Sequence, residues 1–599
     1  GYVATAAQVT TTKPDAKSGT IASNATVLGA SVGRRLTSPL SADILVAIAV
    51  FLVLYLIVRI VAAADVPLPP SNDDIISTDP INLPYYAACS LLRMFVGLVC
   101  SYAFALAFGY WAAHSQKAER LLIPALDVLQ SVPVLGFLSI TVTGFLALFP
   151  GSQLGLEFAA IFAIFTAQAW NLAFSMYNSS LTMPDDMREM SSLFRLNSWL
   201  RFWRLEVPNA AIGLVWNGMM SMGGAWFFLT AAETISVAGQ DYSVPGIGAY
   251  AGIAIDQGNM ANVGWAIFTM VIVVVGVNVL FWRPLVAWAE RFKNEQSAAE
   301  DAPKSGVLNL VRAARLPGGI GAARRRASDK ISLGVTKISR EPRTLVATSP
   351  RTRRVWDVVF WCIVVAGLGY GVWHLLLYVT EESGFGTFLE PIGLGALTML
   401  RVLAVLVLST LIWVPVGIKI GLNPRLSRYA QPLVQIFASF PANFLFPFVT
   451  AFLLATGISI NWGSIFLMML GAQWYILFNV IAGAQAMPSD LREAMANMRV
   501  GGWLWWKRFA LPAVMPSYVT GGITASGGAW NASIVAEVVS FGSTTLTAAG
   551  LGAYISAASA AGNQQQLLTG VIVMSAFVLI INRVLWRPLY NLAEKRYSL

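Results

Sequence analysis

The stretch "EAMANMRVGGWLWWKRFALP", Glu493 to Pro512, carries four charged and four aromatic side chains between segments that are almost wholly apolar. The chain reads "EMSSLFRLNSWLRFWRLEVP" 304 residues earlier, from Glu189 to Pro208, with the same Glu-to-Pro distance of nineteen. Four further motifs recur at this separation: MPDDMRE and MPSDLRE, GGAW twice, GIGAY and GLGAY, and WRPL twice. Motifs that recur in order at one separation indicate that the chain is two fused copies of one unit.

The earlier part of each copy matches at a slightly larger separation. Three pairs are 308 residues apart, namely Arg93 and Arg401, Pro124 and Pro432, and Pro133 and Pro441. One loop of the second copy has therefore lost four residues.

The composition places the protein in a membrane. Of its 599 residues 56% are apolar and only 12% are charged, more apolar than a soluble core requires. Since about 20 apolar residues cross the hydrocarbon layer, twelve spans are predicted: 42–64, 86–112, 121–148, 154–178, 209–232, 261–282, 356–378, 393–420, 432–457, 462–482, 513–535 and 566–586.

These spans predict an all-α membrane protein with about twelve transmembrane helices in two parallel six-helix repeats. The predicted units are a cytoplasmic N-terminal tail (1–40), a first six-span unit (41–286), a basic cytoplasmic linker (287–355) and a second six-span unit (356–599). Because six is even, both copies insert with the same orientation, related by a pseudo-two-fold axis along the membrane normal. The pathway is expected at the interface between the halves.

The positive charge is concentrated in the linker. Residues 287–355 hold fifteen Arg and Lys against six Asp and Glu, a net +9 out of the formal +10 of the chain. No nucleic-acid-binding motif accompanies them, so this cluster indicates cytoplasmic sequence facing anionic lipid rather than a nucleic-acid site. The other basic loops fall on the same side and the acidic loops on the opposite side, which predicts that both termini are cytoplasmic.

Both quoted stretches belong to long loops between the fourth and fifth spans of their copy. Met-Pro starts each loop, acidic residues suited to a helix N-terminus follow, and apolar residues recur at helical spacing. The pattern predicts two short amphipathic helices joined by a turn. Such a loop can lie on the lipid headgroups, but its presence in both copies favours docking surfaces for a cytoplasmic partner.

The loop pattern resembles the coupling motif of binding-protein-dependent ABC transporter permeases of the type I importer fold: E-A-A, a glycine six positions after the Glu, and L-P at the end. The stretches "GGAWNASIVAEVVSFG", "GLGAY" and "PLVQIFASFP" are most similar to the nitrate, taurine and sulfonate branch. The resemblance covers about Leu91–Leu285 and Met399–Leu589.

The resemblance implies that the loops couple to ATPases. The candidate coupling residues are Arg188, Glu189, Arg195, Trp199, Arg492, Glu493, Arg499 and Trp503. Arg195 and Arg499 stand where the family keeps glycine. Either the turn is shaped differently, with Asn197 or the Gly501–Gly502 pair supplying it, or each guanidinium meets a carboxylate of the partner.

The same resemblance implies the partners and the location. The chain has no P-loop motif, so two separate ABC ATPase subunits on the cytoplasmic face would bind ATP and Mg, with no catalytic residue, metal site or cofactor in this chain. A solute-binding protein would dock on the extracytoplasmic segments Ser236–Met260 and Ser540–Gln565, which could instead be re-entrant or gating loops. A bacterial inner membrane is the expected location, with membrane lipids around a multi-pass chain.

Polar and aromatic residues within the spans are candidates for the translocation pathway. They are Gln168, Trp170, Trp226, Glu233, Gln473, Trp474, Trp530, Asn531 and Glu537. Intramembrane carboxylates are costly and face a cavity or a partner, so Glu233 and Glu537 either line the pathway or lock a helix end through a backbone or Arg contact. The expected substrate is a small anionic solute, such as a sulfonate, nitrate or taurine, in an asymmetric site, since Phe227 stands opposite Asn531 in the repeat.

Two other classes share some of these features. A twelve-span secondary transporter with two parallel repeats would not need paired Glu-to-Pro loops, and would be expected to carry coupling charges deep in its helices. A membrane scaffold or channel would assemble or conduct without any ATPase.

Overall fold

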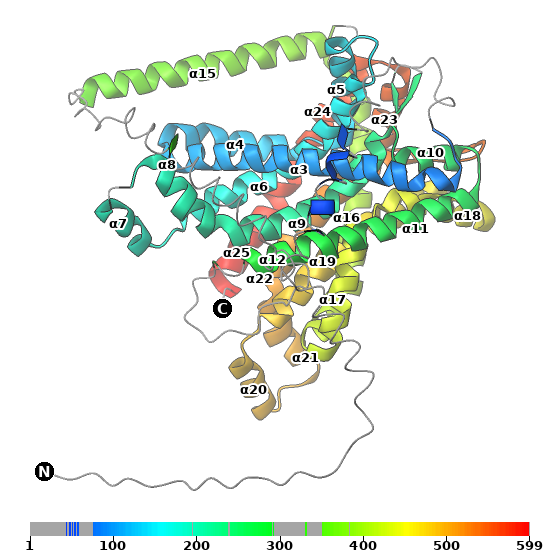
Figure 1. The fold of residues 1–599 in the computed structure, drawn as a ribbon. Helices are drawn as coiled ribbons and strands as arrows, with labels where there is room; N and C mark the ends of the chain where they lie inside the picture. Colours follow the sequence, from blue (N-terminus) through cyan, green and yellow to red (C-terminus); the bar gives the residue numbers. More distant parts are fainter. Residues whose placement is uncertain are drawn as a thin grey trace, which may run out of the picture.

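The computed structural model describes residues 76–194, 196–237, 240–289, 350–381 and 384–597, with residues 292, 330 and 331 and scattered positions from 44 to 58. The predicted N-terminal tail, most of the predicted first span 42–64, most of the linker 287–355, and Arg195 lie outside the described residues. The described chain is almost entirely helical (Figure 1).

From α3 and α16 onward, the two halves contain the same elements in the same order. The first half contains α3 (Leu83–His114), α4 (Gln116–Ser131), α5 (Val134–Leu148), α6 (Leu154–Leu181), α7 (Asp185–Leu193), α8 (Ser198–Arg201), α9 (Val207–Ala232), β1 (Thr234–Val237), β2 (Gln240–Ser243), α10 (Ile247–Asp256), α11 (Met260–Val277) and α12 (Arg283–Ala289). The second half contains α15 (Pro350–Val379), α16 (Leu389–Gly421), α17 (Pro424–Ser439), α18 (Phe446–Thr456), α19 (Ile460–Gln485), α20 (Ser489–Asn497), α21 (Gly502–Trp505), α22 (Leu511–Ala536), β3 (Val538–Phe541), β4 (Thr544–Thr547), α23 (Leu551–Ala561), α24 (Gln564–Ile581) and α25 (Arg587–Tyr597). The predicted duplication is thus present in the fold.

Short turns of other helix types complete the pattern. Four π-helical turns occur in pairs 304 residues apart: Phe202–Glu206 with Trp506–Ala510, and Asn278–Trp282 with Asn582–Trp586. The first pair leads each loop into the following long helix, so the loop is continuous with α9 or α22. Three 3₁₀ turns lie at Pro80–Asn82, Gly384–Phe388 and Ala442–Leu445.

Within the described residues eight helices are long and apolar enough to cross a membrane, or ten if each of two bent pairs is one span. α22 is as long as α9, but it carries more Ser, Thr and Asn residues and is not among the eight. Its membrane crossing stays a prediction, as does that of the span 42–64.

Two spans predicted as single helices are bent instead. The segment 121–148 divides into α4 and α5 at 97°, and the segment 432–457 divides into α17 and α18 at 86°. The two bends were not predicted, and Pro133 and Pro441 lie at the two breaks. A proline disfavours helical geometry at the residue before it, and both preceding residues are extended, with ψ of 125° at Val132 and 130° at Phe440.

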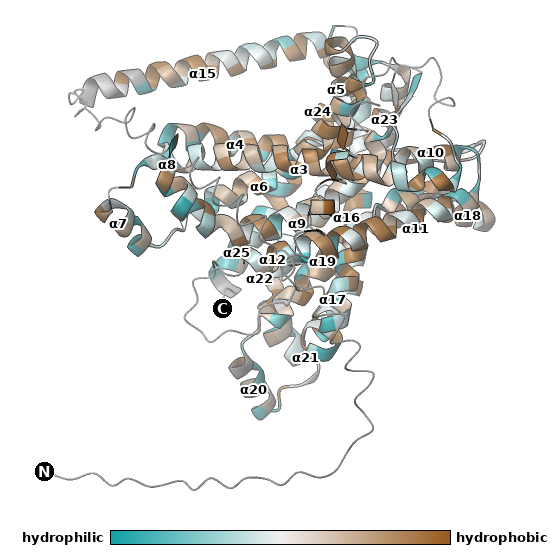
Figure 2. Cartoon of the chain, in the orientation of Figure 1, coloured by the Kyte–Doolittle hydropathy of each residue, from teal (hydrophilic) through white to brown (hydrophobic). Residues whose placement is uncertain are grey.

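Each half contributes side chains to the other half's core. Val134, Leu138 and Val142 of α5 belong to the large apolar cluster of the second half. Phe444 of the second half, 2% exposed, belongs to the cluster built by the first half. Figure 2 shows apolar residues along the long helices and a mixture of hydrophilic and hydrophobic residues on α7 and α20. The halves are therefore packed by exchange of apolar side chains.

Candidate functional site

The two loops fold as predicted, each into two short helices joined by a turn: α7 and α8 in the first half, α20 and α21 in the second. At the end of α20 the Arg499 N–H donates to the Ala496 carbonyl at 3.0 Å and the Val500 N–H donates to the Met495 carbonyl at 3.1 Å. This pair of bonds is a Schellman cap, which satisfies the last carbonyls of a helix. In the first loop, the Leu196 N–H donates to the Ser191 carbonyl at 3.1 Å, which corresponds to the bond from Val500 to Met495 in the second loop.

Arg499 has the left-handed backbone conformation, with φ of +50°, that this cap requires. Left-handed geometry costs a residue with a Cβ about 1–2 kcal/mol, whereas glycine adopts it freely. Gly502 also has a positive φ, of +60°, while Asn197 caps α8 by accepting from the Leu200 N–H at 2.8 Å. Of the two arginines at the glycine position, Arg499 thus makes the turn itself, and Arg195 lies outside the described residues.

The base of the first loop is fixed to the spans. Arg188 donates from Nη2 to the Leu181 carbonyl at 2.8 Å, at the end of α6, where carbonyls lack helical partners. Glu206, 1% exposed, lies where the loop enters α9, with Oε1 3.1 Å from Arg201 Nε and 3.0 Å from His114 Nε2. The second half has Ala510 at the position of Glu206. A charged tie between the loop and the end of α3 therefore exists in the first half alone.

The outer parts of both loops expose apolar side chains. Leu193 is 80% exposed and Trp503 is 74% exposed. Four of the other candidate coupling residues are also exposed, namely Glu189, Arg492, Glu493 and Arg499. Trp199 is partly buried, and the centroid of its ring lies 5.8 Å from that of Trp203. α7 and α20 project from the helical bundle at separate places (Figure 1).

At the opposite ends of the spans, each half buries an arginine against a carboxylate. Arg93 Nη1 is 2.8 Å from Glu233 Oε1, and Arg401 Nη1 is 2.8 Å from Glu537 Oε1. A hydroxyl completes each cluster. In the first half, the Ser90 hydroxyl donates to Glu233 and accepts a hydrogen bond from the first N–H of α10. In the second half, the Thr398 hydroxyl donates to Glu537 and accepts one from the first N–H of α23. Glu233 and Glu537 are thus locked by an Arg contact, one of the two arrangements that the sequence left open.

The two clusters differ in charge. Arg93 also forms two bonds with Glu157, at 2.5 and 2.7 Å. Asn461 occupies the matching position in the second half and accepts from Arg401 Nη2 at 3.0 Å. The first cluster therefore has two carboxylates for one arginine, and the second has one.

Polar contacts join the halves across their interface. The Val134 N–H at the start of α5 donates to Asn531 Oδ1 of α22 at 2.8 Å. Asn443 Nδ2 donates to Thr230 Oγ1 of α9 at 3.1 Å. The residue that corresponds to Asn531 in the first half is Phe227, whose side chain cannot accept a hydrogen bond. The bond between Val134 and Asn531 therefore has no counterpart related by the repeat. The interface is therefore asymmetric at this position, and the asymmetry of the substrate site stays a prediction.

Three small cavities, of about 20, 20 and 40 Å³, lie between α9 of the first half and α17, α19 and α22 of the second. Gly223 borders all three, with Ser439 and Tyr475 each bordering two. A Cβ on Gly223 would lie 2.9 Å from Ser439 Oγ, and one on Gly224 would lie 2.9 Å from Tyr475 Oη. The glycine pair therefore lets two hydroxyls approach α9, and each cavity has room for only one or two water molecules.

The structure gathers only some of the candidate pathway residues at this interface. Trp226 borders one of these cavities and Asn531 bonds across the halves. Five others have neighbours within their own half: Gln168 beside Met94, Trp170 against Phe104, Gln473 accepting from Trp413, Trp474 stacked on Phe437, and Trp530 stacked on Phe577. The pathway role of all nine candidates stays a prediction.

Sequence reasoning missed several of these neighbours. Ser439 and Tyr475 gave no signal, because a lone hydroxyl in a helix is common. Arg93 and Arg401 did give one, since a charged residue within a span of each copy needs a buried partner. That signal indicates that a buried partner exists in each copy, but it does not identify which carboxylate is the partner.

This arrangement defines a duplicated, multi-pass membrane transport subunit. The family described as binding-protein-dependent transport system inner membrane component matches residues 105–286 and again residues 413–596, together more than half of the chain. The chain belongs to this family of ABC importer permeases, with two permease units fused in one polypeptide. Membership implies ATPase and binding-protein partners in general.

Single permeases resemble parts of the chain. The bicarbonate transport system permease protein CmpB of Synechococcus elongatus is 28% identical over 218 residues, which are 36% of this chain and 73% of that protein. A putative ABC transporter permease protein of Methanocaldococcus jannaschii is 24% identical over 239 residues, 37% of this chain and 86% of its own. The nitrate import permease protein NrtB of Leptolyngbya laminosa is 23% identical over 233 residues, which are 35% of this chain and 80% of that protein. Each match has the size of one half.

Proposed function

We propose that this chain is the transmembrane permease subunit of an ATP-driven importer for a small oxyanion, and that each of its two loops docks a separate ATPase subunit. The observation that carries the proposal is the repeated loop, which has two short helices joined by a turn in each half and exposes the apolar side chains of Phe194 and Met498 at matching positions. Closure of the ATPases would pull on both loops and rock one half against the other.

The loop surfaces suit a protein partner. Leu193 and Phe194 end α7, and Met498 and Trp503 flank the turn of the second loop, all of them strongly exposed. Aromatic and large apolar residues of this kind supply most of the energy of a protein interface. The bond of Arg188 to the end of α6 would transmit a displacement of α7 directly to a span. ATP and Mg would bind on the partners.

The substrate class follows from the relatives and from the interface. Permeases named for bicarbonate transport and for nitrate import resemble about a third of the chain, and both solutes are small, planar oxyanions. The cavities beside Gly223 offer neutral donors, the hydroxyls of Ser439 and Tyr475 and the amide of Gln435. Neutral donors can hydrogen-bond an anion in passage without holding it as tightly as a cation would. Selectivity would then rest largely on the extracytoplasmic binding protein, which would dock near the β1–β2 and β3–β4 hairpins.

Reconstitution tests this proposal. The chain would be purified with its co-purifying ATPase, placed in proteoliposomes, and supplied with the binding protein and with nitrate, bicarbonate or taurine. We expect solute-dependent ATP hydrolysis and uptake of one oxyanion, both abolished when the Walker lysine of the ATPase is replaced by Ala. Uptake driven by an ion gradient without the ATPase would instead support a secondary transporter, and passive conductance would support a channel.

A further inference from the structure

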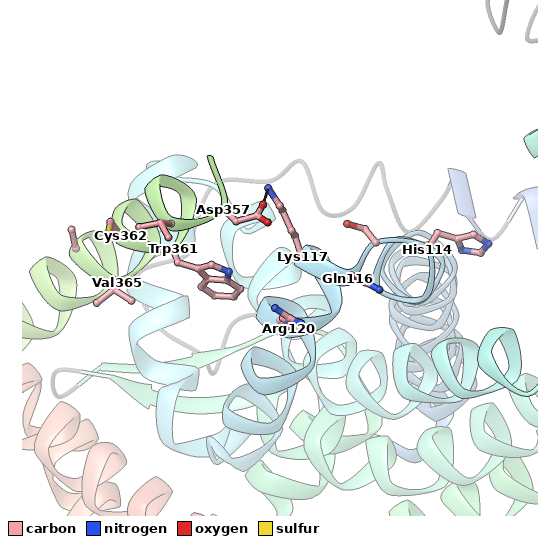
Figure 3. Close-up of a pocket in the computed structure, with 11 residues that line it drawn as sticks. His114, Gln116, Lys117, Arg120, Asp357, Trp361, Cys362 and Val365 are labelled. Carbon is pink, nitrogen blue, oxygen red and sulfur yellow. Dashed lines mark ion pairs between the residues drawn. The ribbon is translucent and has the colours of Figure 1, made fainter. Parts of the chain in front are cut away.

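A large cavity lies between the first span of the second half and the start of α4. It has a volume of about 920 Å³ and is bordered on one side by the turn from α3 to α4 and on the other by α15 (Figure 3). A volume near the upper end of the range for small-molecule sites gives room for a sizeable ligand. No part of the proposed transport function uses this cavity.

The wall formed by the α3–α4 turn is basic. Lys117 and Arg120 both border the cavity. Lys117 Nζ is 2.5 Å from Asp357 Oδ1 of α15, whereas Arg120 forms no ion pair with any residue that the structure describes. The neighbouring carboxylate of Glu119 is occupied elsewhere, since it accepts from the Tyr177 hydroxyl at 2.6 Å. One uncompensated positive charge is thus available to a ligand.

The wall formed by α15 is apolar. Val358, Trp361 and Val365 line it, and Figure 3 shows the Trp361 indole between the α15 backbone and Arg120. These residues begin a stretch, Asp357–Val379, that is apolar enough to cross a membrane, and only 6% of its most apolar 18-residue window is buried inside the protein. Most of the surface of α15 is thus left uncovered by the described residues, and a cavity beside its apolar face is filled by hydrocarbon at lower cost than by water.

The cavity lies beside the ends of two candidate membrane spans. The span of α3 ends at His114 and the span of α15 begins at Asp357, both at its border. Tryptophan and basic side chains gather at this depth of a bilayer. The basic loops of the sequence predict that this is the cytoplasmic side, where anionic lipids are attracted to clustered Lys and Arg.

We propose that this cavity binds an anionic phospholipid, with the phosphate beside Arg120 and Lys117 and an acyl chain along the Val358–Val365 face of α15. The lipid lies between elements of different halves, because α15 opens the second half and α4 belongs to the first. It therefore fills the gap beside the Lys117–Asp357 ion pair and fastens α15 to the opposite half.

Cys362 offers a direct test, because it borders the cavity and is exposed. The full chain with its co-purified subunits would be stripped of lipid in detergent and given phosphatidylglycerol, phosphatidylethanolamine, or inorganic phosphate alone. The rate of maleimide modification at Cys362 would be followed by peptide mass spectrometry, with exposed Cys100 as the internal control. We expect phosphatidylglycerol to slow Cys362 at least fivefold and to leave Cys100 unchanged.

Matched variants locate the charge. Arg428 is the repeat partner of Arg120, 308 residues later, and does not border this cavity. Arg120→Gln is expected to abolish the protection, Arg120→Lys to keep most of it, and Arg428→Gln to keep all of it. Three results would overturn the proposal. Equal protection by phosphatidylethanolamine would indicate general lipid solvation, and protection by inorganic phosphate alone would indicate a site for soluble anions. Full protection in Arg120→Gln would show that the site does not need the arginine.

Discussion

Arg93 and Arg401 stand at matching positions and yet face different charges. Arg93 lies between two carboxylates, Glu233 and Glu157, and Arg401 has Glu537 and the uncharged Asn461. Removing one partner of a buried ion pair leaves the other charge uncompensated. The same substitution should therefore have unequal effects in the two halves.

We expect Glu537→Gln to destabilise the protein by about 3–5 kcal/mol, because Arg401 would lose its only carboxylate. Glu233→Gln should cost less, about 1–3 kcal/mol, because Glu157 still holds Arg93. Thermal unfolding in one fixed detergent–lipid mixture measures both. Asn461→Asp, placed in the Glu537→Gln background, should recover stability, whereas an equal loss in the two single variants would show that the charge difference has no effect.

Arg499 combines a strained backbone with an exposed charge. Arg499→Gly removes the cost of left-handed geometry, so the turn should be as stable or up to about 1 kcal/mol more stable. ATPase coupling should nevertheless fall if the guanidinium contacts a carboxylate of the partner, and fall further when Arg195 is also changed to Gly. Arg499→Gln, which keeps the strain and loses the charge, is the control. Unchanged coupling and assembly in the double glycine variant would exclude such a contact.

At the scale of elements, the ends of α9 and α22 depend on glycine. Gly246 and Gly550 precede α10 and α23 in extended geometry, and a Cβ on either would overlap the carboxylate of Glu233 or Glu537. The first N–H groups of these helices can approach the buried carboxylates because no side chain intervenes. The hairpin between each carboxylate and its glycine brings the two together.

Gly550→Ala should displace Glu537 from Arg401 and lower the unfolding temperature by several degrees. Gly527→Ala is the matched control within the same half, since its Cβ would meet nothing within 4 Å and alanine favours a helix by about 1 kcal/mol over glycine. Melting curves of the two variants should therefore shift in opposite directions. A Gly550→Ala variant as stable as the unsubstituted protein would mean that the carboxylate site can adapt.

The elements themselves could largely be predicted from the sequence. Hydropathy and the repeat gave the long helices and the two-helix loops, because both depend on local patterns. The breaks at Pro133 and Pro441 were missed, although an X-Pro step within a span carries that information. The partners of Glu233 and Glu537 could not be assigned, since Arg93 and Glu233 are 140 residues apart and only the packing of α3 against α9 brings them together.

At the scale of the molecule, the halves are related in fold and differ in the contacts that join them. Ser439 of the second half faces Gly223 at the interface, whereas its repeat partner Ser131 donates to the Asp127 carbonyl at 2.7 Å. Tyr475 has Asn171 as its counterpart. The two hydroxyls that approach the glycine pair, those of Ser439 and Tyr475, thus both come from the second half.

We expect Ser439→Ala to reduce uptake of the transported oxyanion about fivefold, the effect of losing one hydrogen bond of about 1 kcal/mol, with assembly unchanged. Ser131→Ala, the matched substitution, should leave uptake within about twofold of that of the unsubstituted protein. Solute flux into proteoliposomes, with solute affinity of the binding protein measured in parallel, separates transport from capture. Equal effects of the two substitutions would indicate that the hydroxyl at Ser439 has no special place in the pathway.

The hydrogen bond from the Val134 N–H to Asn531 also bears on how such a protein can evolve. In a dimer of identical permeases every substitution is made twice, so an asparagine introduced at this position would appear on both sides of the axis. Joining the copies in one gene frees each side to vary alone, and Phe227 is the residue kept on the other side. The duplication thus turns a symmetric interface into one whose two sides can be selected independently.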